Sequence, residues 1–301
     1  MKLDQLRIFL TVAEVEHVTL ASQRLNLTQS AVTGAIQALE QTHQVALFDR
    51  VGRGIRLNSV GRAFREKARA VLHAVEEAEA LLGDLNQLSR GHLVIHASQT
   101  ITSHWLPRYL VEFRTRHPGV TLEARVGNTR QCLAALMEGH CDLAFVEGAF
   151  HAPLVDEQVV AIDHLAIICA PGHALAGSHW QGLAQLTGWP LILREAGSGT
   201  RSTFDEAIVG AGLASSTLEV ALELWSNEAI CSAVAQSDHI GVVPWIVCEP
   251  LVHTGKLCAL KANLVERPFR VLHHRQRHLS AAAKEFRNLL AGPVRGTADQ
   301  A

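Results

Sequence analysis

A proline-free stretch over residues 59–89 limits the possible folds of this chain more than any other segment. Apolar residues recur in it every seven positions, and a second series follows four positions behind the first. The two series are Phe64, Val71, Ala78 and Leu85, and Ala68, Val75 and Leu82. This spacing predicts one long helix of roughly 45 Å. Its apolar seam needs a partner. A second copy of the chain is the simplest choice, and a larger domain of the same chain is the alternative.

Residues 1–58 have the pattern of short helices packed around one small core. The first helix carries apolar residues at the i, i+3, i+4, i+7 spacing of an amphipathic helix, namely Leu6, Phe9, Leu10 and Ala13. A second helix is expected over residues 20–25 with Thr19 as its N-cap, and a third begins after another capping residue, Thr28. The glycine-punctuated stretch 49–57 predicts a small β-hairpin.

The third helix is amphipathic, and its polar face carries small hydrogen-bonding side chains. Two short helices joined by a turn, the second presenting such a face, are typical of a helix-turn-helix. Glutamine and hydroxyl side chains can read base edges, and a helix N-terminus favours a phosphate group. The candidate DNA contacts are Thr28, Gln29, Ser30, Thr33 and Gln37. A solvated helix face is the alternative explanation of these residues.

Positive charge is concentrated soon after this helix, although the whole chain has a formal net charge of −2. Seven basic residues and a single acid, Glu66, lie between Arg50 and Arg69. Arg50, Arg53 and Arg56 fall in the predicted hairpin, a position suited to the phosphates of duplex DNA. A generic basic surface patch is the alternative.

From about residue 90 onward, short apolar runs alternate with helical stretches. The apolar runs occupy residues 93–95, 120–124, 142–146, 165–168, 191–193 and 240–243. The helical stretches include residues 105–116, 130–138 and 200–211. This alternation predicts parallel sheets covered by helices, with ligands at the carboxyl ends of the strands. Two such halves would form a cleft between them.

Polar clusters follow several of these apolar runs, at positions where a cleft ligand would sit. They occupy residues 98–100, 127–129, 147–148 and 195–201. The last cluster places the hydroxyls of Ser198 and Thr200 and the guanidinium of Arg201 at the start of a helix, which suits an anion. The alternative is an ordinary capped turn in which Arg201 pairs with a nearby acid. Glu147 fits an anion site poorly, because a carboxylate repels anions.

Motifs of common enzymes and metal sites are missing from the sequence. Ser198 is not in a GxSxG nucleophile elbow, because the residues two positions away are Ala196 and Thr200. No GxxxxGK[ST] P-loop occurs, and the 17 histidines include no HExxH. The six cysteines form no CxxC pair, which favours reduced thiols. Cys132 and Cys141 are candidates for a redox pair, and inert buried thiols are the alternative. We therefore expect no enzyme activity, no metal and no cofactor.

The sequence shows no membrane segment. No apolar run reaches the ~18 residues that a bilayer span needs, and the N-terminal residues are too polar for a signal peptide. A cytoplasmic location is therefore expected. The rival interpretation of the whole chain is a solute-binding or enzymatic α/β protein whose helical N-terminal domain does not bind DNA.

Residues 1–90, and more loosely the rest of the chain, resemble the LysR-type transcriptional regulators. The matching segments are residues 3–9, 21–33, 38–40 and 47–50, with Gly61. The resemblance implies an all-α winged helix-turn-helix domain over residues 1–58 and a long linker and dimerisation helix over residues 59–89. It implies an α/β effector-binding domain over residues 90–301, with two lobes like those of a periplasmic binding protein. The expected lobes are about 90–163 with 268–295, and about 164–267.

The resemblance also implies the partners of the protein. They are double-stranded promoter DNA, a small-molecule effector and further copies of the chain, arranged as a dimer of dimers. Segments 223–230 and 240–244 resemble the regulators of sulfur assimilation and carbon fixation, in which hydroxyl-lined helix starts bind anions. The implied effector contacts are Ser98, Thr100, Asn128, Thr129, Ser198, Thr200 and Arg201. Three positions depart from the family: Gly34 replaces a larger side chain, Gln37 stands where a basic residue is frequent, and Asn58 replaces the usual threonine before the linker helix.

Overall fold

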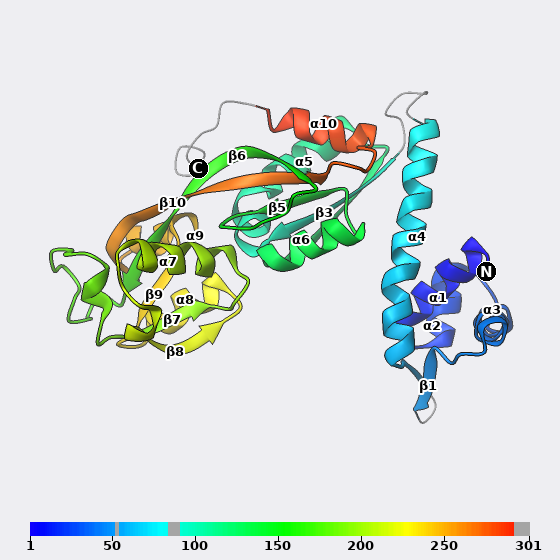
Figure 1. Ribbon diagram of the computed structural model, residues 1–301, viewed down its shortest axis with the longest axis horizontal. Coiled ribbons are helices and arrows are strands. Elements are labelled where there is room, and N and C mark those ends of the chain that lie inside the picture. Colours follow the sequence, from blue (N-terminus) through cyan, green and yellow to red (C-terminus); the bar gives the residue numbers. More distant parts are fainter. Residues whose placement is uncertain (52–53, 84–90, 292–301) are drawn as a thin grey trace. The chain divides into compact units, whose positions relative to one another are not determined.

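The computed structural model describes residues 1–51, 54–83 and 91–291 (Figure 1). The chain forms two compact units, an N-terminal unit and a C-terminal unit. None of the helices in these described ranges combines the length and the apolarity that crossing a bilayer requires.

The N-terminal unit is a winged helix-turn-helix, as the sequence predicted. Its elements are α1 (Leu3–Val15), α2 (Val18–Leu25), α3 (Gln29–His43), β1 (Phe48–Val51), β2 (Gly54–Leu57) and α4 (Ser59–Gly83). β1 and β2 pair antiparallel and form the wing. The core of this unit includes the buried side chains of Leu6, Phe9, Val32, Ile36, Leu39 and Leu57. The predicted apolar stripes of α1 and α3 therefore face one shared core.

The second helix begins earlier than predicted. α2 starts at Val18, and its N-cap is His17, whose Nδ1 accepts a hydrogen bond from Leu20 N at 3.4 Å. Thr19 is therefore a residue of the first helical turn and not the cap. The helix ends at Asn26, which has a left-handed backbone with φ 52°. A short polar side chain tolerates that conformation.

The apolar stripe of α4 is divided between the core of the N-terminal unit and the surface. Phe64 packs against this core, and Ala68 is buried in it. Val71, in contrast, is 41% exposed, and Ala78 is exposed as well. The prediction that the whole stripe faces a partner is wrong for its first part, because α1 packs there. Leu85 lies outside the described residues.

The C-terminal unit is built on eight hydrogen-bonded strands in the spatial order β4-β3-β5-β10-β6-β9-β7-β8. In chain order they are β3 (Gly91–Ser98), β4 (Val120–Gly127), β5 (Leu143–Val146), β6 (Val155–Cys169), β7 (Pro190–Arg194), β8 (Glu219–Leu224), β9 (Ile240–Pro244) and β10 (Cys258–His274). β3 pairs parallel with β4 and β5, and β7 pairs parallel with β8 and β9. The prediction of parallel sheets is confirmed for these pairs and is wrong for β6 and β10, which pair antiparallel with each other and with their other neighbours.

The two long strands β6 and β10 run through both lobes of this unit (Figure 1). β10 pairs with β5 of the first lobe through residues 270–272, and β6 pairs with β9 of the second lobe through residues 165–168. The sequence predicted only residues 165–168 of β6 and missed β10. Charged residues, Pro268 and shifts in register interrupt the apolar pattern of β10. β8, whose side chains are mostly exposed, was not predicted either.

Helices cover the strands of each lobe. They are the π-helix η2 (Ile101–Trp105), α5 (Pro107–Arg116), α6 (Thr129–Glu138), α7 (Gly199–Gly210), α8 (Asn227–Val234), α9 (Trp245–His253) and α10 (Ala281–Leu289), with the short 3-10 helices η3 (Leu183–Leu186) and η4 (Ser215–Thr217). The helix predicted to start at residue 105 begins at Pro107, a residue suited to a first helical position. Each lobe has its own core, with Phe113 and Phe145 in the first and Leu165 and Phe204 in the second.

Candidate nucleic-acid interface and ligand site

The candidate base-contacting side chains are all exposed on α3 or at its start. Ala31 N donates a hydrogen bond to Thr28 Oγ1 at 3.2 Å, so Thr28 caps the helix as predicted. The Thr28 hydroxyl also lies 3.0 Å from Ser30 Oγ. The exposed candidates further include Gln29, Thr33 and Gln37. A helix N-terminus and a row of hydrogen-bonding side chains thus face solvent together, an arrangement that a DNA groove can accept.

The wing presents two of its three candidate arginines in the described residues. Arg50 on β1 and Arg56 on β2 are exposed, whereas Arg53 falls outside the described residues. Arg56 Nε lies 3.7 Å from the Glu16 carboxylate at the end of α1. An ion pair between exposed partners is weak, so this contact leaves Arg56 able to bind a phosphate.

Two polar side chains fix the wing against the helices. Glu40 Oε1 accepts a hydrogen bond from Leu47 N at 2.7 Å, which ties the end of α3 to the start of the hairpin. Asn58 Nδ2 donates to Ala46 O at 2.8 Å, and its Oδ1 accepts from Gly61 N at 2.8 Å. These contacts set the angle between α3 and the wing. Nothing in the local pattern distinguishes the half-buried Glu40 from acids that stay exposed.

Six of the seven candidate effector contacts are buried where the two lobes meet. They are Ser98, Thr100, Asn128, Thr129, Ser198 and Thr200. Ser98 donates a hydrogen bond to the Glu147 carboxylate, and Thr129 Oγ1 donates to the Glu147 carbonyl oxygen at 2.8 Å. The ends of β3 and β5 and the start of α6 therefore converge, as carboxyl ends of neighbouring parallel strands do.

Arg267 on β10 is the cation of this junction, and sequence reasoning missed it. Its side chain is 1% exposed. Its Nε and Nη2 donate to Asp163 Oδ2 on β6 at 3.1 and 2.9 Å, and its Nη1 donates to Thr200 Oγ1 at 3.0 Å. Nη1 also lies 3.3 Å from Glu147 Oε1. One guanidinium thus joins both long strands, the first lobe through Glu147 and the second lobe through Thr200.

A second buried ion pair lies at the same junction. Arg194 donates two hydrogen bonds to the Glu195 carboxylate, at 2.8 and 3.1 Å, and both side chains are buried. Asn128 Nδ2 reaches across from the first lobe to Glu195 Oε1 at 3.1 Å. Arg194 Nη1 donates to Gln99 Oε1 at 2.9 Å, again across the lobes. Each member of this pair therefore also has one hydrogen-bond partner on the opposite lobe.

The rim of the junction carries a further set of contacts between lobes. Asn227 Nδ2 at the start of α8 donates to Thr100 Oγ1 at 3.1 Å. Gln99 donates to the Glu228 carboxylate, and His104 Nε2 lies 3.0 Å from Glu228 Oε1. The hydrogen bond from His104 is the largest cause that lowers the pKa of Glu228, to about 2. The rim therefore holds a carboxylate that stays ionised at neutral pH.

Arg201, the seventh candidate, has partners within its own lobe. Its Nε donates to both Asp205 carboxylate oxygens, at 3.0 and 3.1 Å, and its Nη1 lies 3.4 Å from Glu223 Oε2. Nη1 also donates to the carbonyl oxygen of Arg194 at 3.2 Å. Arg201 thus pairs with two acids of its own lobe, whereas Arg267 contacts the buried hydroxyl of Thr200.

A cavity of about 380 Å³ adjoins this network. Its lining includes Gly148, Thr203, Arg267 and Arg270, with Glu206 at the same wall. Thr203 is buried, and its Oγ1 has no hydrogen-bond partner within the described part of the chain. Thr203, Arg267 and Arg270 therefore contribute to the wall of an open volume beside the lobe junction.

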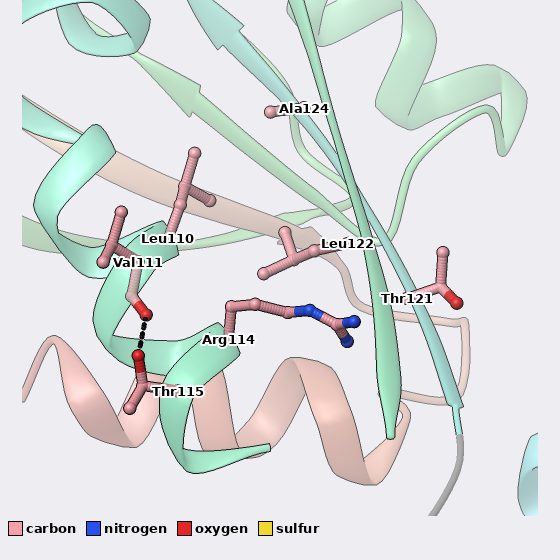
Figure 2. Close-up of a pocket in the computed structure, with 7 residues that line it drawn as sticks. All are labelled: Leu110, Val111, Arg114, Thr115, Thr121, Leu122 and Ala124. Carbon is pink, nitrogen blue, oxygen red and sulfur yellow. Dashed lines mark hydrogen bonds between the residues drawn. The ribbon is translucent and has the colours of Figure 1, made fainter. Parts of the chain in front are cut away.

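A larger hollow, of about 530 Å³, lies between α5 and β4 of the first lobe (Figure 2). Its lining is mainly aliphatic, and includes Leu110, Val111 and Leu122. Arg114 also lines it, but its Nη1 donates to the carbonyl oxygens of Pro118 and Val120, both at 2.6 Å. Binding sites for polar small molecules place a few convergent polar groups in the pocket. Several polar side chains converge at the lobe junction, which makes the junction the better candidate for a ligand site.

The chain joins a winged helix-turn-helix to a two-lobed α/β unit with a polar lobe junction. This combination defines a class of DNA-binding proteins that also carry a domain for binding small molecules. Family models match both parts: the bacterial regulatory helix-turn-helix protein of the lysR family over residues 3–62, and the LysR substrate binding domain over residues 86–293. The chain belongs to the LysR family of transcriptional regulators.

Similar proteins agree with this assignment. The uncharacterized HTH-type transcriptional regulator YeiE of Escherichia coli (strain K12) is 35% identical, covering 94% of this chain and 95% of that protein. The RuBisCO operon transcriptional regulator of Allochromatium vinosum is 30% identical, covering 96% and 95%. Full-length CbnR in complex with its target DNA has the same fold, with a TM-score of 0.70, 20% identity and coverage of 96% and 99%. The regulatory domain of CcmR from Synechocystis PCC6803, in complex with 2-PG, gives a TM-score of 0.61 at 26% identity, covering 67% and 96%.

Proposed function

We propose that this regulator binds promoter DNA through α3 and the wing, and that a small anionic metabolite bound between the lobes modulates this binding. The observation that carries the proposal is the buried Arg267, which contacts Thr200 and Glu147 from opposite lobes. The proposed role of the protein is regulatory and not catalytic. Because its partner is chromosomal DNA, we place the protein in the cytoplasm.

The exposed groups suggest that α3 and the wing contact different parts of the DNA. The side chains of α3 contact base edges, with Thr28 holding the first turn of the helix in place. The DNA contacts are Thr28, Gln29, Ser30, Thr33, Gln37, Arg50, Arg53 and Arg56. The arginines of the wing bind phosphates, which positions the helix in the groove without reading sequence.

The buried guanidinium of Arg267 and the hydroxyl of Thr200 beside it support an anion as the ligand. Glu147 and Asp163 oppose an anion, because they set two negative charges against the single positive charge of Arg267. An anion that enters from the cavity beside Thr203 would accept hydrogen bonds from Arg267 and the nearby hydroxyls and displace a carboxylate. The proposed contacts are Ser98, Thr100, Asn128, Thr129, Ser198 and Thr200, with Arg267 as the cation. The 2-PG complex of CcmR, the relative with 26% identity, supports this ligand class.

Modulation of DNA binding then follows from a change in lobe geometry. Hydrogen bonds between Asn128 and Glu195 and between Thr100 and Asn227 hold the lobes in the arrangement described here. A ligand shifts the balance of conformations only by as much as its affinities for them differ. We propose that an anion at Arg267 favours a different lobe arrangement and so changes how paired winged helices engage DNA.

We further propose that the functional protein is a homotetramer, a dimer of dimers. Val71 and Ala78 on α4 are exposed members of a stripe that repeats every seven residues. A second copy of α4 would cover this stripe by coiled-coil packing.

The test of the proposed DNA interface is a binding titration of the full-length protein with the DNA upstream of its own coding region. Thr33→Ala is expected to weaken specific binding about fivefold or more, since a base contact contributes about 1–3 kcal/mol. Arg50→Ala is expected to weaken binding to all sequences and to lower the salt slope by about one.

Matched control variants separate these effects from general damage. Thr42→Ala changes a residue at the other end of α3, and Arg116→Ala removes an exposed arginine of the C-terminal unit. Both should bind as the unmodified protein does. Wild-type affinity in Thr33→Ala and Arg50→Ala would show that the assigned helix and wing do not contact DNA.

A further inference from the structure

Cys169 and Cys258 oppose each other on the two long strands of the C-terminal unit. They are register partners at the end of β6 and the start of β10, which pair antiparallel. Directly opposed side chains of an antiparallel pair project from the same face of the sheet. Such partners have Cα atoms about 4.5–5.5 Å apart, which is inside the range of about 4.4–6.8 Å that disulfides span.

The two thiols are in contact but differ in their access to solvent. Burial, followed by the neighbouring Cys258 thiol with its hydrogen bond, raises the pKa of Cys169 to about 12. Cys169 is buried, whereas Cys258 is partly exposed and follows an exposed turn over residues 254–256. The other four cysteines are buried as well. Cys258 is therefore the thiol that an oxidant in solution reaches first.

We propose that Cys169 and Cys258 form a reversible disulfide when the protein meets a hydroperoxide. The Cys258 sulfur attacks the peroxide, the O–O bond breaks, and an alcohol leaves, so that Cys258 becomes a sulfenic acid. The Cys169 sulfur then attacks the Cys258 sulfur. An S–S bond forms, the S–O bond breaks, and the hydroxyl group leaves as water with the thiol proton of Cys169. Two thiols are oxidised, and one hydroperoxide is reduced to an alcohol and water.

The position of the bond gives it a structural consequence. Residues 170–257, between the two cysteines, contain β7, β8 and β9 with α7, α8 and α9. A cross-link that closes a long loop stabilises the fold mainly by restricting the unfolded chain. It would also fix the strand pairing next to the irregularity between Ala259 and Lys261. Oxidation is therefore expected to rigidify the lobe that carries Thr200.

The test uses the full-length protein, reduced with dithiothreitol, desalted and exposed to hydrogen peroxide. Free thiols are then alkylated in denaturant and counted by intact mass spectrometry, and peptides are mapped without reduction. We expect two fewer alkylated thiols than the six of the reduced protein, one peptide pair that joins Cys169 to Cys258, and reversal by dithiothreitol. The melting temperature of the oxidised protein should rise by several degrees.

Variants identify the order of the two steps. Cys258→Ser should lose all peroxide reactivity, while Cys169→Ala should stop at a sulfenic acid on Cys258 that dimedone traps. Cys132→Ser, at another buried cysteine, should keep the cross-link. Six alkylated thiols after oxidation of the unmodified protein, a Cys258 that passes directly to sulfinic acid, or a cross-link between chains would each overturn the proposal.

Discussion

Arg267 and Asp163 are register partners on the two long strands, and Arg267 donates two hydrogen bonds to one Asp163 oxygen, at 3.1 and 2.9 Å. Both side chains are buried where the two strands run from one lobe into the other. A buried ion pair adds little by itself, but removal of one partner leaves an uncompensated charge in the interior. The pair thus makes lobe geometry sensitive to any group that competes for Arg267.

Arg267→Met should lower the free energy of unfolding of the C-terminal unit by about 3–5 kcal/mol, because it leaves the carboxylates of Asp163 and Glu147 without their cation. Denaturant unfolding followed by circular dichroism measures this change. Adding Asp163→Asn to Arg267→Met should restore part of the loss. Arg275→Met is the control, since Arg275 pairs with Asp156 at the surface and such pairs contribute about 0–1 kcal/mol. Equal losses in the two arginine variants would contradict the buried role of Arg267.

Phosphate or sulfate should raise the melting temperature of the full-length protein if the lobe junction binds an anion. An anion present at 100 times its Kd stabilises the folded protein by about 2.7 kcal/mol. Thr200→Val removes the hydroxyl that Arg267 contacts, so the anion-dependent rise should disappear in this variant. Arg201→Ala should keep the rise, because Asp205 and Glu223 already occupy that guanidinium. The opposite pattern would place Arg201, and not Arg267, at the anion.

Two glycines of the N-terminal unit should respond to alanine with opposite signs. A Cβ at Gly61 would collide with the carbonyl oxygen of Leu47 and lie 2.6 Å from Leu57 Cδ2. Gly61→Ala should therefore destabilise the unit by about 1–3 kcal/mol, the usual cost of overpacking. A Cβ at Gly34 meets nothing within 4 Å, so Gly34→Ala should stabilise α3 by up to about 1 kcal/mol. Thermal unfolding of the two variants measures both changes in stability. A loss of stability in Gly34→Ala would contradict the finding that a Cβ at Gly34 has open space around it.

Acidification should destabilise the C-terminal unit below about pH 6.5, the ordinary pKa of histidine. Burial first, and the Arg287 guanidinium second, lower the pKa of His273, although Asp156 opposes the shift. The pKa of His274 is lowered as well, by burial and Arg277. The unfolded chain then binds more protons than the folded chain, so stability is full above pH 6.5 and falls as the pH drops.

Melting temperatures between pH 7.5 and pH 5 measure this loss. His273→Gln keeps a hydrogen-bond acceptor for Arg287 but cannot be protonated, so its melting curve should depend less on pH. His151→Gln changes an exposed histidine and should leave the dependence unaltered. An equal pH dependence in His273→Gln would show that other groups cause the loss.

The helix-turn-helix could be predicted because its determinants are local. Thr28 and the residues it caps are three positions apart, and the apolar stripes of α1 and α3 repeat within single helices. The polar groups that follow the strands were also readable, and six candidate contacts lie buried at the lobe junction. The partners of α4 were not readable, since Phe64 and Ala68 have the same spacing as residues that stay exposed.

The amino-acid order by itself determined the helices of the N-terminal unit, several short strands of the C-terminal unit and the polar residues that end them, because those choices depend on neighbours within a few positions. It did not reveal β8, β10 or most of β6. The tertiary structure alone decided that β6 and β10 pair antiparallel, that Arg267 meets Asp163 across 104 positions, and that Arg201 turns to Asp205. Strand direction and charge partners depend on which distant segments share the interior. No short window of sequence contains that information.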